Sequence, residues 1–358
     1  MDRSLSVVMV VPPYFDLPPS GYGGVEAVVA DLVDGLVAAG HKVTLVGADC
    51  RNATMAELVP VWPKALGDRI GDPEVEVAHA MLTRRAVEHL IAVRDVDVVH
   101  DHSFGGPLNA HAYARLGVPT VVTTHGVVHE HNRRYYRGLG RDAGLVSISL
   151  RQRALAPELN WLTTVYNGLR PADWPFRSTK QDYALFLGRY HPNKGAHLAV
   201  LAAHEAGLPI ILAGKKLERA EREYYDDVVI PLLRPGDEAM EVADATLKRQ
   251  LLVNARCLLF PVRWQEPFGM VMIEAMACGT PVVALDSGSV REVVDSSVTG
   301  IVCDRPSELA GAIRRLDTID PAACRRRVVE LFDVTAMTQG YADAYQLATR
   351  KAVTAGTR

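Results

Sequence analysis

Two glutamates eight residues apart flank the start of a predicted helix. Glu266 lies in a loop after an apolar strand, and Glu274 lies about one turn into the apolar helix predicted over Met270–Ala277. Burying a carboxylate beside such a helix is costly unless it bonds a ligand or a partner. The backbone N–H groups that begin the helix can hold a phosphate. These groups belong to Phe268, Gly269, Met270 and Val271. The spacing lets one carboxylate reach the sugar and the other the ribose of a single extended ligand.

Two cations follow another predicted strand. Arg189 and Lys194 come five residues apart, after Gly188 at the end of the strand Tyr183–Leu187 and before the helix Ala196–Ala206. A guanidinium and an ammonium near a helix N-terminus suit a diphosphate. The GxxxxGK[ST] spacing of a P-loop is absent. The other reading of the pair is two cations on the surface.

A histidine and a glycine turn lie at two further strand ends. His125 follows the strand Thr120–Thr124, where an imidazole can bond a sugar hydroxyl or a reacting group, and a structural role is equally compatible with this position. The turn Gly21–Gly24 opens the first helix. Gly23 and Gly24 let the backbone approach an anion there, or serve only as a flexible turn.

Short apolar strands alternate with amphipathic helices in two halves, and the residues above follow the strands. In the first half the predicted strands are Val7–Val11, Lys42–Gly47, Val96–His100, Thr120–Thr124, Val146–Ile148 and Thr163–Tyr166, and the helices are Val25–Ala39, Ala80–Val93 and Leu108–Leu116. The turn Asn167–Pro171 follows. In the second half the strands are Tyr183–Leu187, Ile210–Leu212, Cys257–Phe260, Val282–Ala284 and Ile301–Val302, and the helices are Ala196–Ala206, Glu218–Leu232, Thr246–Asn254, Met270–Ala277, Val290–Val294, Glu308–Leu316 and Pro321–Val353. This alternation predicts an α/β fold with parallel sheets, whose ligands bind beyond the carboxyl ends of the strands.

Composition narrows the class of protein. At 358 residues the chain suits two domains, and a net charge of −3 gives no field that would attract nucleic acid. The five cysteines are scattered without a CxxC pair, which favours a reducing, cytoplasmic compartment. The apolar run Val7–Val11 is too short for a signal core or a transmembrane segment. The basic and aromatic segment Asn132–Arg137 can bind a charged acceptor, touch a membrane surface peripherally, or form a solvated loop.

Together these loops resemble glycosyltransferase family 4, the retaining GT-B enzymes. The resemblance covers essentially the whole chain, and its most specific part is the spacing of Glu266 and Glu274 within EPFGMVMIEAMACGTPVVA. It implies a GT-B fold, in which two Rossmann-like, doubly wound domains face a central cleft. The expected divisions are an acceptor-binding domain over residues 1–168, a nucleotide-sugar-binding domain over 169–334, and a helix over 335–358 that crosses back to the first domain.

The resemblance also implies roles for single residues. Glu274 is expected to bind the donor ribose, and Glu266 to lie against the transferred sugar. Arg189 and Lys194 are expected to hold the diphosphate and to stabilise its departure. His125 is expected to face the donor sugar at the reacting centre.

The remaining implied contacts come from the backbone. Amides around Gly269 and Met270 are expected to bind sugar and phosphate, and the turn at Gly23 and Gly24 to approach the phosphate and the acceptor. The implied reaction retains the anomeric configuration and needs no metal or other cofactor. Its donor is a nucleoside-diphosphate sugar, with a UDP-sugar favoured on family frequency, and its acceptor is a small molecule, a natural product or a lipid-linked sugar.

Three other functions stay open at this stage. A nucleotide-sugar epimerase of GT-B architecture would need no acceptor. An NAD-dependent oxidoreductase is supported by Asp49 after the second strand, but Glu26 occupies the last glycine position of GxGxxG. A non-catalytic sugar-nucleotide-binding protein is the third. The last two are disfavoured by four residues that occur together, Arg189, Lys194, Glu266 and Glu274.

Three short patterns of metal-ligating residue types are given little weight. The DxD sequence Asp95–Asp97 leads into an apolar strand and is interpreted as a strand entry. His100 and His102, like His129 and His131, alternate in a way that allows one shared face, but no further cluster completes a ligand set. We therefore expect no metal site.

Overall fold

The computed structural model describes residues 3–19, 23–49, 54–216, 218–241 and 244–356, and Gly21 and Tyr22 of the predicted glycine turn lie outside these ranges. The chain forms two compact units. The first contains residues 1–168 together with 334–358, and the second contains residues 169–333. The chain therefore passes between the units twice, at Gly168–Leu169 and at Asp333–Val334.

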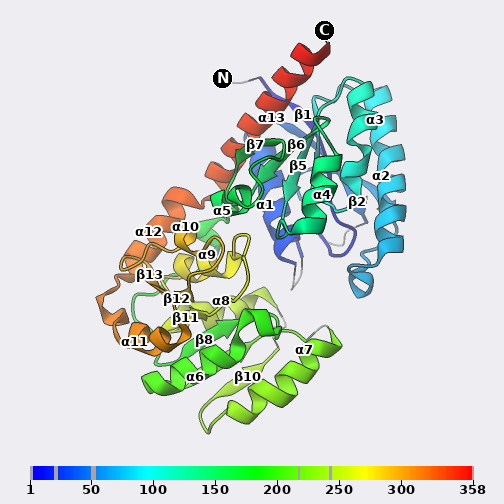
Figure 1. Ribbon diagram of the computed structural model, residues 1–358. Coiled ribbons are helices and arrows are strands. Elements are labelled where there is room, and N and C mark those ends of the chain that lie inside the picture. The colour runs from blue at the N-terminus through cyan, green and yellow to red at the C-terminus, as the bar shows by residue number, and fades with distance from the viewer. Residues whose placement is uncertain (1–2, 20–22, 50–53, 217, 242–243, 357–358) are drawn as a thin grey trace. The chain divides into compact units, whose positions relative to one another are not determined.

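The described part of the first unit contains one seven-stranded parallel sheet in the order β3-β2-β1-β4-β5-β6-β7 (Figure 1). Its strands are β1 (Ser6–Val10), β2 (Lys42–Ala48), β3 (Glu57–Trp62), β4 (Val98–Asp101), β5 (Thr120–Thr124), β6 (Ala143–Ser147) and β7 (Trp161–Thr164). Its helices are α1 (Gly24–Ala38), α2 (Pro73–Val93), α3 (Ala110–Arg115), α4 (Glu130–Gly138), α5 (Leu150–Ala154) and α13 (Val334–Gly356).

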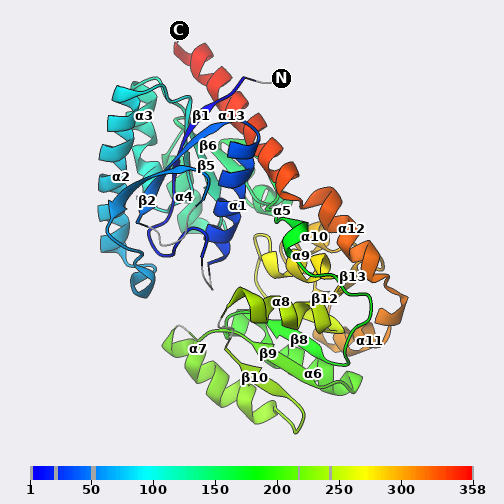
Figure 2. The ribbon, with the colours of Figure 1, turned by 180° about the vertical axis from the view of Figure 1, so that it is seen from behind.

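Helices cover both faces of this sheet. Helices α2 and α3 lie on one face and α1 and α13 on the other, as both views show (Figures 1 and 2). Val87 of α2 packs on Val10 and Val99, which point to the same face of neighbouring strands. On the other face α13 packs on α1, where a Cβ on Gly35 would come within 2.2 Å of the Thr338 hydroxyl oxygen. The C-terminal helix is thus an integral layer of the first unit.

The described part of the second unit contains a six-stranded parallel sheet in the order β10-β9-β8-β11-β12-β13. Its strands are β8 (Ala184–Leu187), β9 (Ile210–Ala213), β10 (Glu238–Met240), β11 (Cys257–Phe260), β12 (Val282–Leu285) and β13 (Gly300–Cys303). Its helices are α6 (Ala196–Ala206), α7 (Arg219–Tyr224), α8 (Ala245–Asn254), α9 (Met270–Ala277), α10 (Val290–Val293), α11 (Leu309–Arg314) and α12 (Pro321–Leu331). The predicted α/β fold with two Rossmann-like domains is confirmed.

Several elements differ from the sequence prediction for local reasons. Helix α2 begins at Pro73 instead of Ala80, because the Asp72 carboxylate accepts the Glu74 N–H and proline suits the first helical position. The edge strand β3 was not predicted, because Pro60 lies within its apolar run and its residues are half-buried or exposed. Helix α4 was not predicted either, and none of its residues is buried.

Both sheets contain a topological switch point. The strand order reverses between β1 and β4 in the first unit and between β8 and β11 in the second. Loops that leave the two central strands of such a sheet diverge to opposite faces and open a crevice at the carboxyl edge. The loops after β8 and β11 carry most of the predicted site residues, so the sheet order itself brings them together.

Candidate functional site

The loops after β8 and β11 meet through Lys194 and Glu266. The Lys194 ammonium lies 2.6 Å from Oε2 of Glu266, and the Trp264 indole N–H donates to the same oxygen at 2.8 Å. The ammonium also lies 4.8 Å from the centroid of the Trp264 ring. In the described part of the chain no hydrogen bond reaches the second carboxylate oxygen, Oε1. Glu266 can therefore keep its cation and still accept a hydroxyl from a ligand.

Two close backbone contacts fix this pair. Gly195 has φ 75°, and a Cβ on it would come within 2.3 Å of the Pro261 carbonyl oxygen after β11. The Arg263 N–H donates to the Asn193 carbonyl at 2.8 Å, which ties the two loops directly. The position of Lys194 is thus set by glycine-dependent packing of its loop against the neighbouring strand end.

The loop after β12 packs against the loop that carries Glu266 and holds its backbone in place. The Ser289 N–H donates to the Glu266 carbonyl at 3.0 Å, and the Ser289 hydroxyl donates to the Phe268 carbonyl at 2.9 Å. The Ser287 hydroxyl donates to the Trp264 carbonyl. Gly288 between them has φ 61°, and a Cβ there would lie within 2.2 Å of Glu266 backbone atoms. Sequence reasoning did not find this support, and the only local signal is the small-residue run after β12.

The start of α9 lies beside this loop. Gly269 precedes the helix with φ 82°, in the left-handed region, and no side chain caps the helix start. Gly269, Met270 and Val271 are partly exposed, whereas Phe268 is buried. A helix start without a side-chain cap offers N–H groups and a partial positive charge to an anion.

Glu274 lies on the next turn of α9 and has a partner that the sequence did not reveal. Lys248 of α8 places its ammonium 2.5 Å from Oε1 of Glu274 and 5.4 Å from the centroid of the Trp174 ring. Both charged side chains are largely buried, at 9% and 27% exposure for Glu274 and Lys248. Lys248 thus compensates the charge of the predicted buried carboxylate.

Arg189 is held by acidic residues at the start of α7. Its Nε donates to Glu221 at 2.6 Å and its Nη2 donates to Glu218 at 2.5 Å. Glu221 is fully buried, so this guanidinium has a defined position. Gly188, just before it, donates its N–H to the Ala213 carbonyl within the sheet. The Gly188 N–H is therefore already used within the sheet and cannot donate to a ligand.

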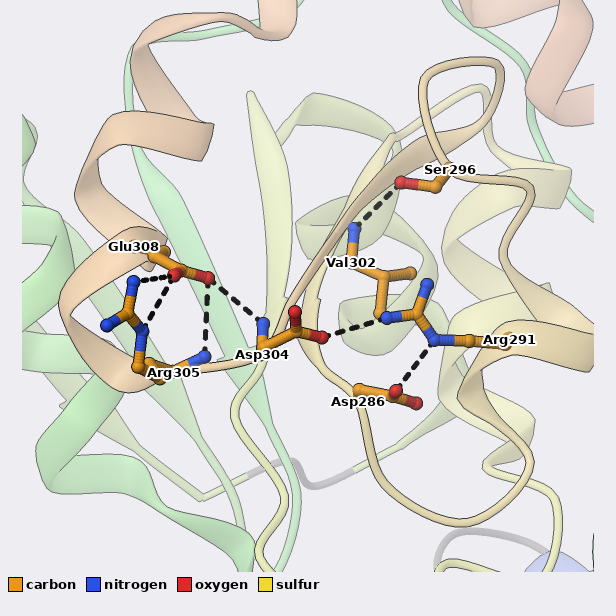
Figure 3. Close-up of polar contacts among 7 residues, drawn as sticks. All are labelled: Asp286, Arg291, Ser296, Val302, Asp304, Arg305 and Glu308. Carbon is orange, nitrogen blue, oxygen red and sulfur yellow. Dashed lines mark hydrogen bonds and ion pairs between the residues drawn. The ribbon is translucent and has the colours of Figure 1, made fainter.

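A second arginine joins two carboxylates at the edge of the same sheet (Figure 3). Arg291 donates to Asp286 at 2.6 Å and to Asp304 at 2.9 Å, after β12 and β13 respectively. Its side chain is 54% exposed, and solvent screens such surface pairs. This arginine contacts none of the predicted site residues in the described ranges. Like Arg189 it bonds two carboxylates, but it lies away from the predicted site.

His125 belongs to the first unit, after β5. Its Nε2 lies 2.8 Å from Nδ1 of His102, which follows β4. Burial lowers the pKa of His125 to about 4, so the imidazole is neutral near pH 7.

The glycine turn at the start of α1 is also in the first unit. Gly23 has φ 149°, and Gly24 is the first residue of the helix. A Cβ on Gly23 would lie 2.9 Å from the Pro19 side chain and 3.2 Å from a Glu26 carboxylate oxygen. Glu26 is buried, and this burial raises its pKa to about 7.

The second unit contains all of the predicted residues from the ends of β8 and β11 and from α9, and a hydrogen bond joins two of them, Lys194 and Glu266. These predicted residues are Gly188, Arg189, Lys194, Glu266, Phe268, Gly269, Met270, Val271 and Glu274. The predicted residues His125, Gly23 and Gly24 belong to the first unit. Among the described residues, no group of three or more His, Cys, Asp or Glu side chains is arranged to hold a metal ion. In the same ranges no helix has the length and apolar character needed to span a membrane.

Known proteins resemble both units. Residues 22–165 match the family described as Glycosyltransferase Family 4, and residues 173–326 match the family described as Glycosyl transferases group 1. Two Rossmann-like domains of this kind are the architecture of GT-B glycosyltransferases. The chain belongs to glycosyltransferase family 4, and it is an enzyme of the sugar-transferring class.

Individual relatives match over most of their length. The phosphatidyl-myo-inositol mannosyltransferase of Mycolicibacterium smegmatis is 29% identical over 317 residues, which are 83% of this chain and 80% of that protein. The structure of AviGT4, a glycosyltransferase involved in avilamycin A biosynthesis, matches with TM-score 0.74 and 27% identity over 97% of this chain and 98% of that one. The structure of Anabaena Alr3699/HepE in complex with UDP and glucose matches with TM-score 0.74 over 96% and 99%, and at 18% identity it shows the fold alone.

Proposed function

We propose that this enzyme is a retaining, metal-independent glycosyltransferase that moves a sugar from a nucleoside-diphosphate sugar to an acceptor hydroxyl. The second unit holds the donor, and the first unit holds the acceptor and presents His125 to the transferred sugar. The observation that carries the proposal is the arrangement at the β8/β11 switch point. There Lys194 is bonded to Glu266, beside an α9 start that no side chain caps.

Each charged group suits one part of such a donor. The unbonded oxygen of Glu266 can accept a sugar hydroxyl, and Glu274 can accept the ribose hydroxyls through its second oxygen. Arg189 and Lys194 suit the diphosphate, because both are fixed by carboxylates before a ligand arrives. Fixed donors stabilise charge that grows on a leaving diphosphate without reorganising during the reaction.

The same cations support the proposal that no metal is needed. In the proposed reaction negative charge moves onto the β-phosphate as the sugar leaves. Lys194, Arg189 and the α9 start supply positive charge at that position, which a divalent ion would otherwise supply. We expect turnover to persist in EDTA, and loss of turnover that magnesium or manganese restores would contradict this part of the proposal.

A UDP-sugar is the favoured donor, and the fold match to a structure that contains UDP and glucose supports this choice. The acceptor is proposed to be a lipid-linked sugar, a natural product or a small metabolite. One relative is named phosphatidyl-myo-inositol mannosyltransferase, and another is a glycosyltransferase involved in avilamycin A biosynthesis. A cytoplasmic site of action, with peripheral membrane contact where the acceptor is a lipid, is supported by four unpaired, buried cysteine thiols among the described residues.

Thermal unfolding with UDP, GDP, ADP and NAD tests the donor assignment. A nucleotide at 100 times its dissociation constant stabilises the folded protein by about 2.7 kcal/mol. We expect UDP to raise the melting temperature and NAD to leave it unchanged. Glu274→Gln should abolish the UDP shift, whereas the control Glu308→Gln, at a half-buried glutamate that pairs with Arg305 after β13, should retain it. A shift with NAD alone would contradict the donor assignment.

Product analysis separates transfer from epimerisation. A transferase releases UDP from the UDP-sugar in proportion to a new glycoside, whereas an epimerase converts the sugar and consumes no acceptor. We therefore expect mass spectrometry of reactions with candidate acceptors to show equal amounts of UDP and glycoside. The anomeric configuration of that glycoside, read from its proton coupling, tests retention.

A further inference from the structure

A bonded pair of imidazoles lies at the carboxyl ends of β4 and β5. His102 Nδ1 and His125 Nε2 are 2.8 Å apart, and the two rings stack with centroids 5.2 Å apart and an interplanar angle of 26°. His102 is 5% exposed, and its backbone N–H donates to the Val10 carbonyl of β1 at 2.9 Å. His102 thus lies between the two strands of the switch point and reaches the histidine that the proposed function places at the sugar.

A hydrogen-bonded network around His100 lies against the His102 ring. The His100 ring lies 4.0 Å from the His102 ring, centroid to centroid. Both nitrogens of His100 are bonded, at 2.8 Å each, to the Tyr345 hydroxyl on α13 and to the Thr123 hydroxyl on β5. Thr123 is bonded in turn to the Tyr341 hydroxyl at 2.9 Å. Because these groups are buried and mutually bonded, the position of the His100 ring, against which the His102 ring lies, is fixed by the fold.

The direction of the bond between His102 and His125 decides which nitrogen of His125 carries a proton. Burial lowers the pKa of both imidazoles, so each is neutral near pH 7 and carries one N–H. His102 Nε2 is buried and has no hydrogen-bond partner among the described residues. If His102 accepted the bond at Nδ1, this Nε2 would be a buried N–H without an acceptor. If His102 donates, only an unpaired acceptor is buried, which folded proteins tolerate better.

We propose that His102 is a positioning residue that donates its Nδ1–H to Nε2 of His125, so that His125 presents an N–H from Nδ1 to an oxygen of the transferred sugar. The proposal rests on the proposed function for His125. It assigns His125 the role of a neutral hydrogen-bond donor and excludes a role as a general base at that nitrogen. The tautomer of an imidazole is set by the bond that its other nitrogen makes.

Nitrogen NMR of the full-length protein labelled with 15N-histidine tests the bond directly. The chain contains twelve histidines, and His125→Gln identifies the His125 signals by their loss. In the unmodified protein we expect the His125 proton on Nδ1. In His102→Leu we expect His125 to lose this fixed tautomer. A proton on Nε2 of His125 in the unmodified protein would overturn the proposal.

Two isosteric replacements test the consequence for turnover. Asparagine places an amide N–H near the position of Nδ1, and leucine has nearly the same shape without a donor. Melting temperatures of both variants serve as the control for folding. We expect His102→Leu to lower kcat about tenfold with little change in the donor KM. His102→Asn should restore most of this loss. Equal kcat values for the two variants would overturn the donor role of His102.

The two experiments distinguish this inference from the proposed function. If His125→Ala leaves turnover unchanged, the role of His125 at the sugar is wrong, whatever tautomer the NMR spectrum shows. If His125→Ala lowers kcat and the spectrum shows the proton on Nε2, the proposed function stands and the positioning role of His102 is wrong.

Discussion

Removing the ammonium of Lys194 should separate the two roles that its position indicates. Lys194→Met keeps most of the side-chain stem and deletes the charge. In the folded protein the charge neutralises Glu266, whose side chain is only 10% exposed. In the proposed reaction it also faces the charge that develops on the leaving diphosphate. The first role concerns stability and the second concerns kcat, so the two can be measured independently.

The expected magnitudes follow from the contacts. Glu266 keeps its bond from the Trp264 indole in the variant but loses its cation, so a buried carboxylate is left with one donor. We expect a loss of about 1–3 kcal/mol in the free energy of unfolding. Loss of one preorganised donor to the leaving group lowers kcat by roughly 10²–10³-fold. Lys194→Met/Glu266→Gln removes the unpaired charge, so it should regain stability without regaining kcat.

The assay is steady-state release of UDP with the UDP-sugar varied, together with urea unfolding of the single variants Lys194→Met and Glu266→Gln and of the double variant. If Lys194→Met kept the kcat of the unmodified protein and only raised KM, Lys194 would be a simple binding contact. The leaving-group role would then be wrong. A double variant no more stable than Lys194→Met would show that the ion pair does not account for the stability loss.

Three further predictions use matched pairs or a pH series. Arg189→Ala should lower kcat by roughly 10²-fold, whereas Arg291→Ala, which also releases two carboxylates, should leave steady-state kcat unchanged. Gly288→Ala should lower kcat by about 10²-fold, because the new Cβ would clash with the Glu266 backbone. The control Gly140→Ala, at φ 64° with no atom within 4 Å of the new Cβ, should lower only stability. Equal kcat values for the two variants would refute the supporting role of Gly288. Burial lowers the pKa of His79 from 6.5 to about 4. On acidification the His79 imidazole is therefore protonated in the unfolded chain at a higher pH than in the folded protein, and stability is lost as pH falls from 6.5 toward 4. His79→Leu should therefore lose about 2 kcal/mol less than the unmodified protein between pH 7 and pH 5, measured by urea unfolding.

The elements that position the site could be predicted because their signals are local. The predicted bounds of α6 and α9 agree with the structure, since an apolar periodicity and flanking glycines define both. Strands β8 and β11 were predicted from their apolar runs. The loops that carry Arg189 and Glu266 were therefore predicted as well, and the sheet order confirmed that they are neighbours.

The partners of the site residues could not be predicted, because they come from distant parts of the chain. Lys248 lies 26 residues before Glu274 and on a different helix. Ser289 supports Glu266 through backbone contacts that leave no pattern in the sequence. His102 was noted only as an alternating ligand-type residue, and its bond to His125 depends on the pairing of β4 with β5. Tertiary packing decides each of these contacts.

The pairing of every site cation with a carboxylate is consistent with a reaction in which charge grows at one place. Arg189, Lys194 and Lys248 would repel one another if unpaired, and their acidic partners fix each at one position. An ammonium has three donors, so Lys194 can hold Glu266 and a phosphate oxygen at once. The same carboxylates weaken the attraction of these cations for a diphosphate that already carries its full charge. The proposed site therefore gains most when negative charge increases during transfer, and it does not bind the departing diphosphate too tightly to release it.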